Sequence, residues 1–148
     1  MPIAADLDSF LARNIPLTQA MGIRLLHHDA RGLALAAPLA PNVNDKGTAF
    51  AGALATLVTL AGWALTQLTL EAHGETAQVV VADSQLHYLR PVRGEIVAAC
   101  ALPPAEAVVD FLQTYRRRGR ARWLLHAEIL EQGHPALRYS GHYVAYRG

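Results

Sequence analysis

The sequence predicts a single α+β domain in which one long apolar helix lies among strands. The chain has 148 residues, close to the roughly 150 of an average domain. Residues 48–70 hold no charged side chain, which is typical of a helix buried at the centre of a domain. On both sides of this run, apolar and polar residues alternate with a period of two, the pattern of strands with one buried face.

The first half of the chain is expected to form a helix, a hairpin and the long helix. Pro16 weakens the second half of the first helix, because proline lacks the backbone N–H that a helix interior uses. The turn-like residues 29–32 separate two alternating runs and predict the hairpin. The expected elements are a helix over residues 8–20, strands over 22–27 and 33–39, and the long helix over residues of about 50–72.

The second half is expected to form four strands and one helix. The pair Pro103-Pro104 opens this helix, since proline is tolerated where the first N–H has no partner. The segment 132–134 forms the turn of a terminal hairpin. The expected elements are strands over residues 78–89, 95–102, 122–131 and 136–146, and a helix over 103–118.

Composition excludes several classes of protein. The apolar fraction of 52% excludes a disordered chain, and a net charge of +1 gives no support for binding nucleic acid or an anionic membrane. Only 17% of residues are charged, which predicts that a second copy of the chain covers part of the surface. Residues 48–70 are long enough to span a membrane, but their threonines and the acidic residues that follow favour a core helix without membrane insertion.

Cysteine and histidine usage narrows the chemistry further. The single cysteine, Cys100, allows no internal disulfide and fits a reducing compartment. The first six residues lack the basic start and apolar core of a signal peptide, so we expect a cytoplasmic protein. The seven histidines fall on separate expected elements without the i, i+4 spacing of a ligand pair, and no metal site is expected.

The polar loop 42–48 leads directly into the N-terminus of the long helix. Free backbone N–H groups and the positive end of the helix dipole would face an oxygen atom placed there, such as a carboxylate, a phosphate or a developing oxyanion. Gly52 would let a ligand approach this backbone closely. An equally good interpretation of the residue types is that Asn44 or Asp45 caps the turn and Gly47 bends it.

Several segments carry a family resemblance. They read NVNDKGTAFAG at residues 42–52, LAGWAL at 60–65, YLRPV at 88–92, GRAR at 119–122 and SGHYVA at 140–145. In this order, and over nearly the whole chain, they resemble the hotdog-fold thioesterases and, more narrowly, the YiiD-type C-terminal thioesterase domains. The resemblance implies an antiparallel sheet wrapped around the long helix, the sheets of two protomers joined in a dimer, and active sites between the protomers.

The resemblance also assigns roles to residues. Asn44 would act on the substrate, and the backbone N–H groups of Ala51 and Gly52 would form an oxyanion hole. The long strand of the other protomer, with Val81, Asp83 and Ser84, would line the opposite wall.

The chain departs from the superfamily where its acid is expected. In the common hydrolase branch, an Asp or Glu two turns into the helix acts as base or nucleophile. This chain has Thr59 at the matching position, and it has Phe50 where the motif usually has a histidine. Threonine has no useful basicity near neutral pH, so base-assisted hydrolysis would need Asp45 or Asp83. Decarboxylation of a malonyl thioester, a reaction also associated with the YiiD-type family, needs no base at the breaking bond. It needs a held carboxylate and a stabilised enolate oxygen.

The expected function is therefore the processing of acyl thioesters carried on coenzyme A or acyl carrier protein. Thioester hydrolysis is the first interpretation, malonyl-thioester decarboxylation that feeds fatty acid initiation is the second, and a non-catalytic acyl-CoA binding module is the third. No cofactor is expected beyond the coenzyme A or phosphopantetheine of the substrate. The protein is expected to form a homodimer or homotetramer. The candidate catalytic residues are Asn44, Thr48, Thr59, Asp83 and Ser84; the oxyanion-hole residues are Ala51 and Gly52; the candidate substrate-binding residues are Asn42, Phe50, Arg90 and Arg93.

An arginine run at residues 116–122 has two interpretations. Such a run is most often a solvated face of a helix or strand. It also fits contact with the phosphates of coenzyme A or with an acidic carrier protein.

Overall fold

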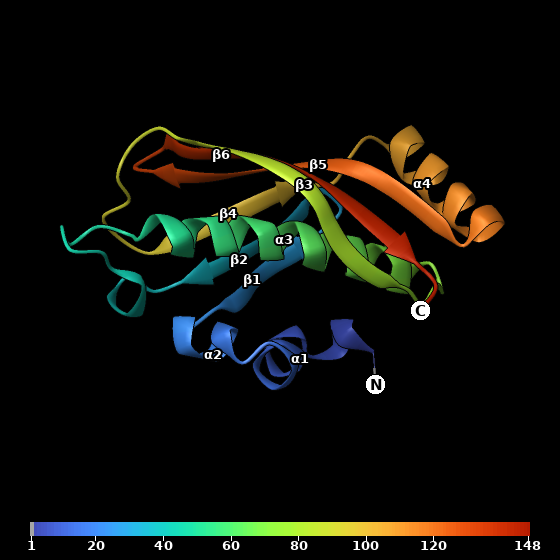
Figure 1. Cartoon of the computed structure of the whole chain (residues 1–148), viewed down its shortest axis with the longest axis horizontal. Coiled ribbons are helices and arrows are strands. Elements are labelled where there is room, and N and C mark those ends of the chain that lie inside the picture. The colour runs from blue at the N-terminus through green and yellow to red at the C-terminus, as the bar shows by residue number, and fades with distance from the viewer. Residues whose placement is uncertain (1) are drawn as a thin grey trace.

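A six-stranded antiparallel sheet wraps around the long helix α3 (Figure 1). This computed structural model describes residues 2–148. The strand order is β1-β2-β4-β5-β6-β3, so β1 and β3 form the edges, and the α+β fold predicted from the sequence is confirmed. The strands are β1 (Arg24–Asp29), β2 (Gly32–Ala37), β3 (Gln78–Tyr88), β4 (Ile96–Ala101), β5 (Arg120–Glu131) and β6 (His134–Tyr146); the helices are α1 (Leu7–Asn14), α2 (Leu17–Met21), α3 (Ala51–Ala72) and α4 (Ala105–Arg118).

Helix α3 forms the centre of the core, as its lack of charge predicted. Leu57, Leu65 and Leu68 on its sheet-facing side are at most 2% exposed. The helix has the length and hydropathy of a membrane span, yet 72% of its most apolar window is buried inside the protein. Burial of this extent is what an uncharged core helix requires.

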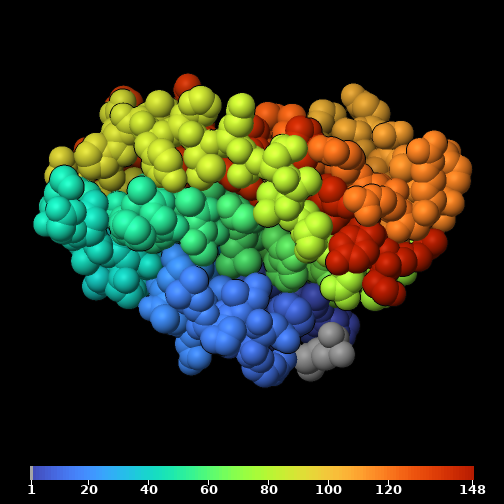
Figure 2. Space-filling model, viewed as in Figure 1, coloured from blue at the N-terminus to red at the C-terminus, as the bar shows by residue number. Residues whose placement is uncertain are grey.

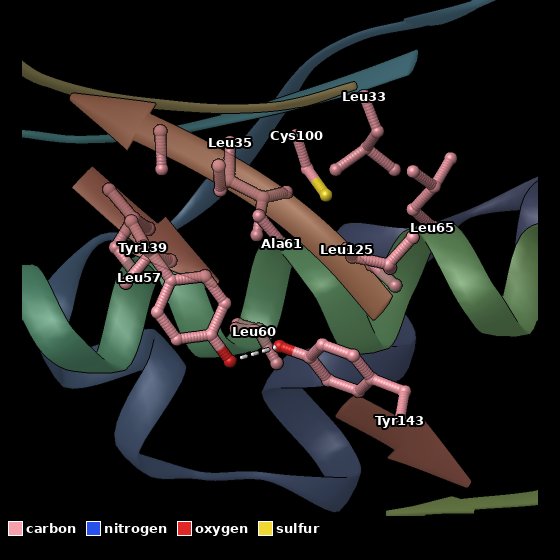
Figure 3. Packing of buried hydrophobic residues seen from close by; sticks show 14 of the residues in the cluster. Leu33, Leu35, Leu57, Leu60, Ala61, Leu65, Cys100, Leu125, Tyr139 and Tyr143 are labelled. Atoms are coloured by element: carbon pink, nitrogen blue, oxygen red, sulfur yellow. Dashed lines mark hydrogen bonds between the residues drawn. The ribbon is translucent and has the colours of Figure 1, made fainter. Parts of the chain in front are cut away.

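Strand side chains fill the space between the sheet and α3 (Figure 3). Each fully buried leucine contributes roughly 1.5–3 kcal/mol relative to its exposure in the unfolded chain. Burial also raises the pKa of the Cys100 thiol to about 12, so this cysteine is a small core residue. The residues packed here include Leu33 and Leu35 of β2, Cys100 of β4, Leu125 of β5, and Leu57, Ala61 and Leu65 of α3.

The single helix expected over residues 8–20 is instead two helices, α1 and α2. Pro16 disfavours the helical conformation of Ile15, whose φ and ψ are −131° and 78°, and the helix ends there. The break lets both short helices lie along α3, where the ring of Phe10 stacks on that of Trp63 at 6.1 Å. Figure 2 shows them as the blue surface below the green surface of α3.

The terminal hairpin is tighter than the sequence predicted. Gln132 and Gly133 alone form its turn, with φ angles of 49° and 80°, so β6 begins at His134 rather than at residue 136. Two positive φ values in a two-residue loop match the twist of the flanking strands. Helix α4 covers one end of β5 (Figure 1). The rings of Phe111 and Trp123 stack there with centroids 4.2 Å apart.

Strand β3 is an edge strand with a bulge near its middle. Val81 pairs with Tyr143, and Asp83 pairs with His142, so one extra residue lies between them on β3. Consecutive residues of β6 point to opposite faces of the sheet, and the two β3 residues therefore do so as well. Val81 faces α3, whereas Asp83 lies on the opposite side, which we call the outer face.

Candidate active site

The loop before α3 is held in one conformation by the Asn44 side chain. Its amide oxygen accepts the backbone N–H groups of Lys46 (2.8 Å) and Thr48 (3.1 Å), and its amide nitrogen donates to the Thr48 hydroxyl (2.9 Å). These bonds close a turn at Gly47, whose φ is 80°. Asn44 and Thr48 thus organise the loop, and a direct contact of either side chain with substrate stays a prediction.

Asn42 and Phe50 lie at the two ends of this loop. The Asn42 amide is 4% exposed and donates to the carbonyls of Met21 and Pro38, both at 2.8 Å. Its donors therefore tie the loop to the end of α2. Phe50 is 56% exposed, and its ring lies over Gly52, where an added Cβ would overlap it.

The N-terminus of α3 presents free backbone donors. No side chain caps the helix at Phe50. Within residues 2–148, the backbone N–H groups of Ala51 and Gly52 have no acceptor, and the first helical bond runs from the N–H of Ala53 to the Phe50 carbonyl (2.9 Å). Unpaired N–H groups at a helix start can bind an oxyanion. The role of these two residues as an oxyanion hole stays a prediction.

Two adjacent hollows open along the half-exposed side of α3. In Figure 2 this side is the green band between the yellow-green β3 and the blue α1 and α2. The Thr59 hollow measures about 390 Å³ and the Gly52 hollow about 400 Å³, and both include Thr56. The Thr59 hollow is lined by Ile15, Ala55, Thr56, Thr59, Leu60, Trp63, Val81 and Tyr143; the Gly52 hollow is lined by Leu17, Met21, Pro41, Asn42, Val43, Phe50, Gly52, Ala53 and Thr56.

The Thr59 hydroxyl differs from those of the other threonines on α3. Thr56, Thr66 and Thr69 each donate to the carbonyl four residues earlier, at 2.7–2.8 Å. Across the described chain, the Thr59 hydroxyl makes no such bond, although this residue lines its hollow and is half-buried. A ligand in the hollow can therefore use this hydroxyl as a donor or an acceptor.

A pair of buried tyrosines supports the helix at this point. The Tyr143 hydroxyl donates to the Thr59 carbonyl (2.6 Å) and shares a bond of 2.7 Å with the Tyr139 hydroxyl (Figure 3). Burial, followed by the bond with Tyr139, raises the pKa of Tyr143 well above its ordinary value. Tyr143 therefore stays protonated and cannot serve as a base near neutral pH.

The two acids considered for catalysis lie away from the Thr59 hollow. Asp45 is exposed on the loop, where its carboxylate pairs with the ammonium of Lys46 at 3.1 Å. Asp83 is on the outer face, with its carboxylate 2.7 Å from Nδ1 of His142 and 3.7 Å from the guanidinium of Arg122. Among residues 2–148, neither hollow is lined by an acidic side chain.

The remaining candidates, Ser84, Arg90 and Arg93, line neither hollow. Ser84 pairs with Gly141, so it faces the α3 side from the exposed edge strand. Arg90 and Arg93 are exposed in the connection after β3, which joins the site loop through a bond from the Ala49 N–H to the Val92 carbonyl (2.8 Å). Within one chain, the structure does not bring these three side chains together with Thr59.

Comparison with known proteins assigns the chain to a family. The family described as "Putative thioesterase (yiiD_Cterm)" matches residues 4–147. The chain belongs to this family. A protein of unknown function from Chlorobaculum tepidum TLS is similar at 31% identity over 96% of this chain and 93% of that chain, with a TM-score of 0.92.

Two further solved structures are similar. A putative thioesterase from Shewanella oneidensis matches at 28% identity over 95% of this chain and 94% of that chain, with a TM-score of 0.82. A thioesterase from Haemophilus influenzae matches at 14% identity over 95% of this chain and 88% of that chain, with a TM-score of 0.72, and shares the fold alone. The hotdog fold and the thioesterase family expected from the resemblance are thus confirmed.

The sequence analysis did not single out several residues that lie at the candidate site. Ile15, Trp63 and Tyr143 line the Thr59 hollow, and the Tyr88 hydroxyl lies 3.5 Å from the Ala51 carbonyl. Trp63 had a signal, because it shares the stripe of small and polar residues on α3 with Thr59. Tyr143 had none, since its place depends on the pairing of β6 with its neighbours.

Proposed function

We propose that this protein processes acyl thioesters carried on coenzyme A or acyl carrier protein. The acyl group would occupy the Thr59 hollow, and the thioester oxygen would lie at the N–H groups of Ala51 and Gly52. The observation that carries this proposal is a largely apolar hollow with one free hydroxyl, beside a helix N-terminus with unpaired donors. Membership of a thioesterase family agrees with it.

Among the reactions open to such a site, the geometry favours decarboxylation of a malonyl thioester. Base-assisted hydrolysis needs a basic side chain near the thioester carbon. In the described chain neither hollow has a lining acid, Asp83 lies on the outer face, and Tyr143 holds its proton. Decarboxylation needs only hydrogen-bond donors for the carboxylate and the enolate oxygen, and the Thr59 hydroxyl and the helix N–H groups supply them.

The proposed reaction balances without any further reactant than a proton. The bond between the carboxylate carbon and the methylene carbon breaks, and carbon dioxide leaves. The electron pair forms an enolate whose oxygen is stabilised by the N–H groups of Ala51 and Gly52. Water then delivers a proton to the methylene carbon, and the product is an acetyl thioester. Thr59 lies seven residues beyond Gly52 on α3, which is about 10 Å along the helix within one protomer. A site between two protomers would therefore combine the N–H groups of one copy with the Thr59 hydroxyl of the other. That hydroxyl would hold the carboxylate out of the thioester plane, so that the breaking bond aligns with the carbonyl π system.

The products distinguish the three possible functions. Purified protein would be incubated separately with malonyl, acetyl and long-chain acyl thioesters of coenzyme A and of acyl carrier protein, and both carbon dioxide and free thiol would be followed. We expect carbon dioxide from malonyl thioesters at a rate well above thiol release. Thiol release without carbon dioxide would identify a hydrolase, and neither product from any substrate would identify a binding module.

The proposal includes a homodimer joined through β3. This edge strand has 11 residues, and its exposed apolar side chains include Val80 (45% exposed) and Val81 (41% exposed). A long apolar edge with unpaired backbone groups favours pairing with a second copy. Light scattering at micromolar concentration should show at least a dimer of the 16.0 kDa chain, and a monomer alone would contradict this part of the proposal.

A further inference from the structure

Arginines gather at the end of the molecule formed by α4 and the start of β5. The whole chain has a net charge of only +1, yet residues 111–127 hold five arginines and no acidic residue. Arg147, next to the end of β6, adds a sixth at the same place, where its guanidinium carbon lies 5.3 Å from the ring centroid of Tyr115. The arginines on the segment are Arg116, Arg117, Arg118, Arg120 and Arg122.

Some of these side chains already have partners. Arg116 pairs with Glu75 (3.3 Å) and donates to the His73 carbonyl (2.9 Å). Arg122 reaches Asp83 at 3.7 Å, which is a long contact between exposed groups. For Arg118 and Arg120, residues 2–148 offer no carboxylate within 4.0 Å and no hydrogen-bond partner.

Three of these arginines border one hollow. It measures about 400 Å³, lies apart from the Thr59 and Gly52 hollows, and is lined by Thr114, Arg118, Arg120, Ala121, Arg122 and Val144. Gly119, with a φ of 71°, ends α4 and turns the chain directly into β5. Arg120 and Arg122 alternate along β5, so they share its outer face. A helix end and a regular strand, rather than a loop, thus hold the three arginines.

A purely structural explanation accounts for only part of this arrangement. Cations in the last turn of a helix stabilise it by interacting with the negative end of the helix dipole. That effect applies to Arg116, Arg117 and Arg118 on α4. It does not apply to Arg120 and Arg122, which lie beyond Gly119 on β5. Their positive charges lie close together on one face of the strand, and the helix dipole does not explain this.

We propose that the hollow formed by Thr114, Arg118, Arg120 and Arg122 binds a phosphate group of a small molecule. Guanidinium groups bind phosphate through paired, charge-assisted hydrogen bonds, and the Thr114 hydroxyl can donate another. A concave site favours a ligand that inserts a compact anion. This site is independent of the proposed reaction at Thr59, because it neither shares a residue with that hollow nor needs a thioester.

Isothermal titration calorimetry tests this site on the full-length protein. The probes are pyrophosphate and adenosine 3′,5′-bisphosphate, which separate recognition of phosphate alone from recognition of a nucleotide that bears it. We expect at least one probe to bind, with an affinity that falls as salt rises. Similar affinity for both probes supports a simple phosphate site, and tighter binding of the nucleotide supports a nucleotide phosphate as ligand.

Matched variants locate the binding. Arg118→Ala and Arg120→Ala should each weaken it by about 10-fold, as expected for loss of a charge-assisted pair. Arg117→Ala removes the same charge outside the hollow and should change it by less than about 2-fold. Asp83→Asn removes the carboxylate that pairs with Arg122 and should strengthen binding of the probe. Asp83 does not line the hollow, so this variant leaves the hollow itself unchanged. Failure of the wild type to bind either probe at millimolar concentration, or equal weakening by Arg117→Ala, would overturn the proposal.

Discussion

Removing the Tyr143 hydroxyl should destabilise the protein more than most single-atom changes. The side chain is 0% exposed, and its hydroxyl bonds to the Thr59 carbonyl (2.6 Å) and the Tyr139 hydroxyl (2.7 Å). Each bond contributes about 1 kcal/mol net, and leaving the buried Tyr139 hydroxyl with a lost partner costs about 1–3 kcal/mol more. We therefore expect Tyr143→Phe to lower the free energy of unfolding by about 3–5 kcal/mol.

Urea denaturation of four variants tests this reasoning. Tyr139→Phe should cost about 1 kcal/mol, because Tyr143 keeps its bond to Thr59. The double variant should cost about 2–4 kcal/mol less than the sum of the single variants, because that sum counts the shared bond twice and includes the penalty for an unpaired Tyr139 hydroxyl. Tyr146→Phe, on the same strand and without a hydrogen bond to its hydroxyl in residues 2–148, is the control and should stay within about 0.5 kcal/mol of wild type. Additive single effects would show that the two hydroxyls do not depend on each other.

Three further predictions follow from the packing. Asn44→Ala should lower turnover by about 10²-fold and the melting temperature as well, because Asn44 holds the loop before α3; unchanged rate and melting would contradict this. Gly62→Ala should cost about 1–3 kcal/mol in urea denaturation, since its methyl would overlap the Tyr143 hydroxyl, whereas Gly94→Ala, which meets open space, should not. Cys100, with a pKa of about 12, should resist thiol reagents at pH 8 until urea unfolds the protein, and rapid labelling of the native protein would contradict its burial. The free energy of unfolding should fall as pH rises from about 9 toward 12, because the folded state keeps the thiol proton to a higher pH than the unfolded state does.

The fold and the position of the site could be predicted because they depend on local patterns. An uncharged run of 23 residues, 48–70, predicts a buried helix, and α3 indeed spans Ala51–Ala72. Period-two alternation located all six strands to within a few residues. The loop before α3 was identifiable because polar residues and glycine precede the uncharged helix, and the structure places both hollows beside that helix.

The face on which Asp83 lies could not be predicted. The resemblance placed Val81 and Asp83 on the same wall of the site, and ideal alternation agrees, because residues two apart share one face of a strand. The bulge between them sends Asp83 to the outer face, toward His142. Bulges depend on the register with the neighbouring strand, which a single sequence does not reveal.

The most direct test of the account is the rate at which a malonyl thioester releases carbon dioxide when the Thr59 hydroxyl is removed. Thr59→Val keeps the shape of the side chain and deletes the one threonine hydroxyl of α3 that makes no bond to the helix backbone in the described chain. Thr69→Val makes the same change on α3 away from both hollows and is the matched control. We predict a loss of about 10²-fold for Thr59→Val and less than about 3-fold for Thr69→Val, with both proteins folded. Equal rates in the two variants would contradict the placement of the reaction at Thr59.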